Sequence, residues 1–179
     1  MTEKEIKNIS VAKKLSKADQ FSEILTENKE RIYWLVRKMV LVHDDANDVT
    51  QDVFLKVWKS LDSFKGESSY YTWVHRIAVN ESLNFLEKKK RRLNTSELNE
   101  HLFNCLISDE YFNGDEEIKK LHNAILRLPD KQRLVFNMKY FEAKKYSEIS
   151  KLTGTSEGAL KASYHLAVKK ITLLLTNEG

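Results

Sequence analysis

The sequence predicts an all-α protein with two small helical domains joined by a flexible acidic linker. Five glycines and one proline in 179 residues are few for a fold built on strands and tight turns. The chain is instead rich in lysine, glutamate, leucine and alanine, which have high helix propensity. Apolar residues recur every three to four positions through most of the chain, as on one face of a helix. A hydrophobic content of 41% suffices for the core of one ordinary domain or two small ones.

The net charge of +4 is unevenly distributed along the chain. Residues 88–92 form an unbroken basic run, whereas residues 93–117 contain no lysine or arginine but several carboxylates. This alternation predicts an N-terminal domain over residues 17–92, a linker over 93–116 and a C-terminal domain over 117–176. Two basic domains favour a polyanion such as nucleic acid as the partner.

The N-terminal domain is predicted to contain three amphipathic helices. The first spans about residues 19–42, the second follows at once, and the third runs from Tyr70 into the basic run. Residues 43–45 (HDD) interrupt the first apolar stripe and offer capping side chains for the second helix. A serine at position 68 or 69 is the expected N-cap of the third. The second helix carries the expected core stripe Ala46, Val49, Val53, Val57 and Leu61, widened by Phe54 and Trp58.

The C-terminal domain is predicted to end in a helix-turn-helix. Residues 118–128 and 131–141 read as two helices separated by Pro129. A short helix from Tyr146 then reaches the turn at residues 153–156 (TGTS), and a longer helix follows, with Leu160, Tyr164, Ala167 and Ile171 turned inward. Two helices joined by a short glycine-containing turn are typical of DNA-binding proteins, although other helical hairpins share the pattern. The linker is expected to hold a short helix around residues 97–107.

Seven segments carry a resemblance to a known family. They are DANDVTQDVFLKVW (45–58), FKGESS (64–69), WVHRIAVN (73–80), LPDKQRLVF (128–136), YFE (140–142), YSEI (146–149) and GALK (158–161). In this order they resemble domains 2 and 4 of the ECF (extracytoplasmic-function) RNA polymerase sigma factors, over roughly residues 21–175. The resemblance implies a transcription factor that directs core polymerase to promoters and promotes DNA opening. It implies no catalytic residue, cofactor or metal.

The resemblance also assigns a polymerase-binding face to the second helix. Asp48, Gln51 and Asp52 match the positions that dock on the clamp coiled coil of the polymerase β′ subunit. Carboxylates there offer charge-assisted hydrogen bonds to arginine or lysine of a partner. Asp44, Asp48 and Asp52 repeat at four-residue spacing, an arrangement that costs about a few tenths of a kcal/mol per pair and favours a use elsewhere. A contact with the β flap and an anti-sigma partner that masks these surfaces are further implications of the family.

Promoter DNA is the second implied partner, in double- and single-stranded form. Extruding a base of the −10 element from the duplex costs stacking energy, which contacts between the protein and the base must offset. Aromatic rings and small polar residues supply such contacts. The −10 candidates are Lys65, Gly66, Glu67, Ser68, Ser69, Tyr71, Arg76 and Asn80. The phosphate-binding candidates are Lys88, Lys89, Lys90, Arg91 and Arg92. The −35 candidates are Ser156, Glu157, Lys161, Ala162, His165 and Lys169.

The recognition helix departs from the family pattern. Many relatives carry arginine where this chain has Ser163, Leu166 and Val168. Bidentate contacts from arginine to guanine are the commonest specific readout, so their loss weakens the expected −35 recognition. Arg133 and Lys139 are expected to assist with phosphate.

Two other function classes share features with this sequence. His43-Asp44 on a helical scaffold resembles a metal-dependent phosphohydrolase of the HD type, but the remaining histidines are scattered, so all five are expected at the surface or as caps. A helix-turn-helix regulator with an N-terminal sensing domain would bind duplex DNA alone, whereas a sigma subunit needs core polymerase.

The sequence also predicts a cytoplasmic protein. Cys105 is the only cysteine, which excludes an intramolecular disulfide or a cysteine-based zinc site. Residues 1–19 lack the apolar stretch of a signal peptide, and no segment is apolar enough for membrane insertion.

Overall fold

The computed structural model describes residues 16–92, 95–108 and 116–177, and this part of the chain consists of helices joined by turns and short loops. The N-terminal domain is a bundle of α2 (Lys17–Val40), α3 (His43–Ser60) and α4 (Tyr70–Arg92), with a 3₁₀ turn at Leu61–Ser63. Each of the three helices packs against the other two. The predicted all-α class is therefore confirmed.

Local sequence explains where the first two helices begin and end. Ser16 and Asp19 form a reciprocal capping box at the start of α2, and Leu41 ends the helix in a left-handed conformation (φ 67°). The predicted capping of α3 by residues 43–45 was wrong, because Val42 is the N-cap and makes no side-chain bond. Those residues instead form the first helical turn, where two aspartates complement the positive end of the helix dipole.

The predicted stripe of α3 forms the core of the N-terminal bundle. Its five members from Ala46 to Leu61 are buried, and so is Phe54. Trp58 was wrongly placed in the core, because it is 39% exposed. Its ring meets Phe21 edge-on at 5.2 Å, and the Lys17 ammonium lies above it.

The C-terminal domain contains α6 (Glu116–Leu126), α7 (Asp130–Tyr140), α8 (Tyr146–Thr153) and α9 (Glu157–Asn177). The predicted helix-turn-helix is the pair α8 and α9. Gly154 between them has φ 70°, a left-handed conformation that favours glycine. The core of this domain comprises Ala124, Ile125, Leu128, Phe136, Ala167 and Ile171.

Part of the predicted linker is helix α5 (Thr95–Ile107), as expected around residues 97–107. Leu102 of α5 is 1% exposed and packs with Leu126 of the C-terminal domain, next to Leu41 and Val42. The acidic linker residues 109, 110 and 115 lie outside the described residues, as do residues 1–15. Flexibility of the linker stays a prediction.

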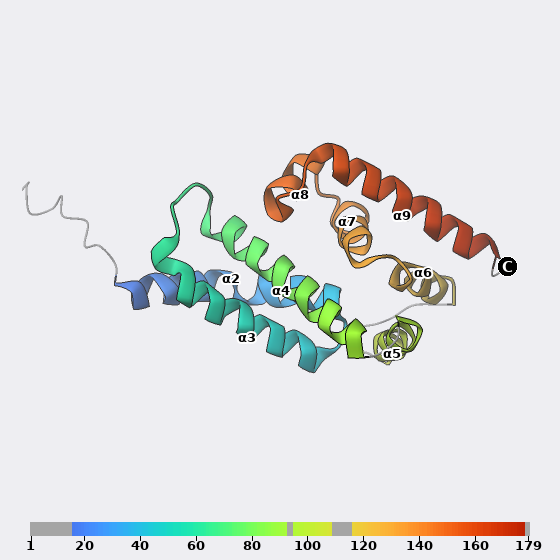
Figure 1. Cartoon of the computed structure of the whole chain (residues 1–179), viewed down its shortest axis with the longest axis horizontal. Helices are drawn as coiled ribbons and strands as arrows, with labels where there is room; N and C mark the ends of the chain where they lie inside the picture. Colours follow the sequence, from blue (N-terminus) through green and yellow to red (C-terminus); the bar gives the residue numbers. More distant parts are fainter. Residues whose placement is uncertain (1–15, 93–94, 109–115, 178–179) are drawn as a thin grey trace, which may run out of the picture.

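The two domains pack directly against each other, with the C-terminal helices along one side of the N-terminal bundle (Figure 1). A continuous apolar cluster joins the core of the bundle to five buried residues of the C-terminal domain, which are Leu134, Val135, Met138, Ile149 and Leu160. Within the described ranges, none of the helices has the length and hydropathy to cross a lipid bilayer.

Candidate functional site

The outer face of α3 presents the predicted polymerase-binding residues. Asp48, Gln51 and Asp52 are all exposed, and their spacing of three and four positions places them on one side of the helix. Figure 1 shows α3 on the side of the bundle turned away from the C-terminal helices. This ridge of Asp48, Gln51 and Asp52 is therefore accessible to a partner while the two domains are packed together.

An apolar groove of about 360 Å³ lies beside the ridge, between α2 and α3. Its walls include Phe21, Leu25 and Gln51, together with the exposed side chains of Leu55 (56%) and Trp58 (39%). Sequence reasoning missed Leu55, although its position four residues after Gln51 places it on the same helical face. The face thus combines carboxylates, an amide and accessible apolar surface.

The loop between α3 and α4 holds its polar side chains at the surface. Its four residues Lys65, Gly66, Glu67 and Ser69 are exposed, Ser68 is half-buried, and Gly66 has φ 72°. Ser69 caps α4 by accepting a hydrogen bond from the Thr72 amide at 3.2 Å. On the other side, the Phe64 ring lies 4.8 Å from both Tyr70 and Trp73. The loop is anchored at both ends.

The three predicted −10 residues on α4 differ in their surroundings. Asn80 is exposed. Arg76 donates a hydrogen bond from Nε to the carbonyl oxygen of Lys151 in α8, at 2.8 Å. Tyr71 is half-buried, with the Arg31 guanidinium 5.9 Å from its ring centre. Arg76 is exposed yet contacts the C-terminal domain, whereas the ring of Tyr71 packs beside α2 of its own domain.

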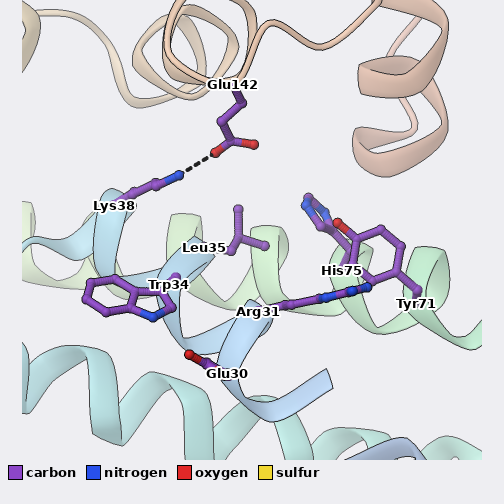
Figure 2. A pocket seen from close by; sticks show the side chains of 8 residues that line it. All are labelled: Glu30, Arg31, Trp34, Leu35, Lys38, Tyr71, His75 and Glu142. Carbon is purple, nitrogen blue, oxygen red and sulfur yellow. Dashed lines mark hydrogen bonds and ion pairs between the residues drawn. The ribbon is translucent and has the colours of Figure 1, made fainter. Parts of the chain in front are cut away.

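A pocket of about 280 Å³ lies between the domains beside Tyr71 (Figure 2). Lys38 of α2 reaches across it to Glu142, which follows α7, at 3.0 Å. Lys144 binds the same carboxylate at 2.6 Å. Burial alone would raise the pKa of Glu142, but the hydrogen bonds from Lys144 and Lys38 outweigh burial and hold this pKa below its ordinary value. Glu142 is an ionised link between the domains.

His75 lines the same pocket and is 3% exposed, so its predicted surface position was wrong. The pKa of His75 is lowered to about 4, and burial is the largest cause. The nearby Lys144 ammonium also lowers this pKa, and its effect is larger than the opposite effect of the Glu142 carboxylate. The imidazole is neutral at physiological pH.

The basic run at the end of α4 is largely paired with carboxylates. Lys89 binds Asp45 of α3, and Arg91 binds Glu87 at 2.6 Å. Lys90 binds Asp130 of α7 at 2.7 Å, across the domain boundary. The remaining members of the run, Lys88 and Arg92, are exposed.

Arg133 lies in the interior, so its predicted help in phosphate binding was wrong. It is 4% exposed and donates from Nη2 to Asp130 at 3.1 Å and to the Met39 carbonyl at 3.4 Å. Burial lowers the pKa of Arg133, while the Asp130 carboxylate opposes this effect. Lys139 donates to the Lys144 carbonyl at 3.2 Å and is also engaged within the protein.

The outward face of α9, together with Ser156 just before it, carries the −35 candidates. Leu160 and Ala167 are buried as expected, which orients the helix. All six candidates are exposed, namely Ser156, Glu157, Lys161, Ala162, His165 and Lys169. Leu166 (51%) and Val168 (38%) are exposed too, on the helix where arginine was expected from the family.

The phosphohydrolase alternative finds no support at His43. Its Nδ1 lies 2.8 Å from the Tyr33 hydroxyl and its Nε2 lies 3.1 Å from the Asn47 amide, so both ring nitrogens are occupied. Across the described ranges, histidine, cysteine and carboxylate side chains form no group of three that could hold a metal ion.

Comparisons with known proteins address both domains. Residues 24–92 match the family model of Sigma-70 region 2, and residues 118–171 match that of Sigma-70, region 4. The chain belongs to the ECF family of RNA polymerase sigma factors. It is 26% identical to the ECF RNA polymerase sigma-E factor of Escherichia coli, over 85% of each chain. It is 28% identical to the ECF RNA polymerase sigma factor SigW of Bacillus subtilis, over 86% of this chain and 88% of SigW.

Solved structures share the fold of this sigma factor. The sigma factor RpoE of Bartonella quintana, solved with the anti-sigma factor NepR, aligns with a TM-score of 0.60 at 21% identity. That alignment covers 88% of this chain and 97% of RpoE. CnrH, solved with the cytosolic domain of CnrY, aligns with a TM-score of 0.59 at 19% identity, over 89% of each chain.

The family defines the function. The protein is a sigma factor that binds core RNA polymerase and promoter DNA and directs transcription initiation. Sigma factors are non-enzymatic initiation factors. A helix-turn-helix regulator that acts alone is not favoured, because the N-terminal domain matches Sigma-70 region 2.

Proposed function

We propose that the α3 ridge docks this sigma factor on the clamp coiled coil of the β′ subunit. The observation that carries the proposal is the exposed ridge of Asp48, Gln51 and Asp52 beside the apolar groove at Leu55 and Trp58. Protein interfaces combine an apolar centre that excludes water with polar groups that fix orientation. Charge-assisted hydrogen bonds from the ridge would supply that orientation.

The two domains then divide the promoter between them. The N-terminal domain (17–92) would hold the −10 element with its α3–α4 loop and α4, while residues 88–92 follow phosphates. The C-terminal domain (117–176) would meet the β flap and read the −35 element with α9. The protein would act stoichiometrically in the cytoplasm, where its polymerase and promoters are. The complex of its structural neighbour RpoE with the anti-sigma factor NepR favours a similar regulator here.

A double substitution tests the ridge. Asp48→Ala with Gln51→Ala should weaken binding of the full chain to core polymerase by roughly tenfold or more, because a carboxylate and an amide of one interface are lost together. Binding is measured by fluorescence anisotropy of the labelled protein without DNA, and circular dichroism checks the fold.

A matched control removes the same two chemical groups from α4. Asn84→Ala with Glu87→Ala also takes one amide and one carboxylate, three positions apart, from an exposed helix surface. This control should bind core polymerase normally. Normal binding by the ridge variant would show that the docking face is elsewhere.

A further inference from the structure

An apolar pocket of about 360 Å³ lies where the end of α2 meets α6 and α7. Its walls include Leu41 after α2, Ile125 and Leu126 of α6, and Phe141 after α7. The His122 ring lies parallel to Phe141, with the ring centres 5.9 Å apart, and gives one wall a flat surface. Sites for small molecules are concave and mostly apolar, often lie between domains, and have volumes of roughly 300–1,000 Å³. This pocket has the form of such a site.

Two polar side chains line the pocket with hydrogen-bonding groups that are not used. Arg133 is 4% exposed, and its Nη2 donates both of the hydrogen bonds that the side chain makes within the described residues. Its Nε and Nη1 groups are therefore available, and a buried donor without a partner is costly. Asn137, one turn further along α7, makes no side-chain hydrogen bond in the same part of the chain. The pocket thus offers donors to a ligand.

The charge around the pocket favours an anion. Asp130 is shared between Arg133 at 3.1 Å and Lys90 at 2.7 Å, and Glu142 is likewise shared between Lys38 and a second lysine. Each carboxylate faces two cations, which leaves an excess of positive charge at this junction. None of the described residues that line the pocket is acidic. A guanidinium binds a carboxylate through two parallel hydrogen bonds, so a carboxylate fits the buried arginine.

We propose that this pocket binds a small monocarboxylate with an apolar body. The buried Arg133 receives the carboxylate, and Asn137 adds a hydrogen bond. The apolar walls enclose the body, while the half-exposed Lys38 and Phe141 stand at the entrance. At about 30 Å³ for each non-hydrogen atom, the volume holds a ligand of about twelve such atoms. The site is separate from the α3 ridge, so it is independent of the proposed polymerase docking.

Titration calorimetry on the full chain tests the site with octanoate, an aliphatic acid of nearly this size. Octanoate should bind with a Kd on the order of 0.1–1 mM, as expected for so small a ligand. Octanamide has the same shape without the charge, and it should bind roughly tenfold or more weakly because it leaves the Arg133 guanidinium without an anion. Since both domains form the walls, octanoate should also raise the Tm of the chain more than octanamide does.

Two variants locate the binding. Arg133→Met removes the buried cation and should remove most of the preference for octanoate over octanamide. Phe141→Ala removes an apolar wall at the entrance, leaves the pair of Arg133 and Asp130 intact, and should weaken both ligands roughly three- to tenfold. It keeps the test decisive if Arg133→Met does not fold. Tyr140→Ala is the matched control, because this neighbouring aromatic residue is 56% exposed and does not line the pocket.

Three results would overturn the proposal. The first is an absence of octanoate binding by the unmodified chain, as expected if another part of the protein fills the pocket. The second is equal affinity for octanoate and octanamide, which would exclude a role for the buried cation. The third is an effect of Phe141→Ala no larger than that of Tyr140→Ala, which would place the bound acid elsewhere on the protein.

Discussion

His75 lies on α4 with its imidazole buried against the C-terminal domain. Its Nδ1 makes no hydrogen bond within the described part of the protein. The charged groups that face it are Lys144, which disfavours the imidazolium, and Glu142, which favours it. Burial has the larger effect, so the domain contact tolerates only the neutral ring.

This burial predicts an acid-sensitive stability. The folded-state pKa of about 4 is below the ordinary 6.5, so between these pH values the unfolded chain binds a proton that the folded chain does not. The free energy of unfolding should therefore fall as pH is lowered from 6.5 to 4, by up to about 3 kcal/mol from this residue. Urea unfolding across this window measures it. His75→Phe should flatten the slope, and an unchanged slope would assign the acid sensitivity to other groups.

Sequence could not identify these interior charged and titratable residues. His75 and Arg133 have the spacing of ordinary helix-surface residues within their own domains. Each is covered by the other domain, as the bond from Arg133 to the Met39 carbonyl shows across 94 positions of sequence. Local periodicity contains no information about such contacts. It did identify Val53 and Val57 of α3, because a helix within one bundle buries its apolar face.

At the scale of secondary structure, α9 has two kinds of lysine. Lys161 is exposed on the first turns of α9, with its ammonium 5.8 Å from the Tyr146 ring centre. Lys170 is bound instead to the Arg127 carbonyl of the α6–α7 connection at 2.8 Å. The N-terminal part of a recognition helix contacts base edges, so position along the helix separates a reader from a structural contact.

The two lysines therefore predict different effects on transcription. Lys161→Ala should lower run-off transcription from promoters with a defined −35 element by roughly fivefold to tenfold, since one good base or phosphate contact contributes about 1–1.4 kcal/mol. Lys170→Ala is the matched control on the same helix and should have little effect. An equal loss on templates without a −35 element would show that Lys161 acts elsewhere than in −35 recognition.

The ends of the helices were less predictable than their faces. The stripe of α3 was found, yet its first turn was assigned to a cap, because aspartate is common both as an N-cap and in the first helical turn. Likewise, Trp58 was expected in the core and Leu55 was not singled out, yet both side chains are exposed at the same groove. Whether an apolar side chain on a helix flank is buried depends on how closely the neighbouring helix approaches.

For the whole molecule, the continuous core cluster has a thermodynamic consequence. Leu134, Met138 and Ile149 of the C-terminal domain belong to the same apolar cluster as the core of the N-terminal bundle. All three tryptophans, Trp34, Trp58 and Trp73, lie in the N-terminal domain. Tryptophan fluorescence therefore reports mainly on the N-terminal domain, with Trp34 also lining the pocket between the domains, whereas far-ultraviolet circular dichroism reports on the helices of both.

A substitution confined to the C-terminal domain tests whether the two domains unfold together. Ile171 is 5% exposed within that domain's own cluster, so Ile171→Ala should lower the free energy of unfolding by about 2–4 kcal/mol. If the shared cluster couples the domains, the fluorescence midpoint in urea should move as far as the circular dichroism midpoint, because a cooperative unit gives coincident transitions. An unmoved fluorescence midpoint would mean that the N-terminal bundle unfolds independently, and that the domain contact contributes little to its stability.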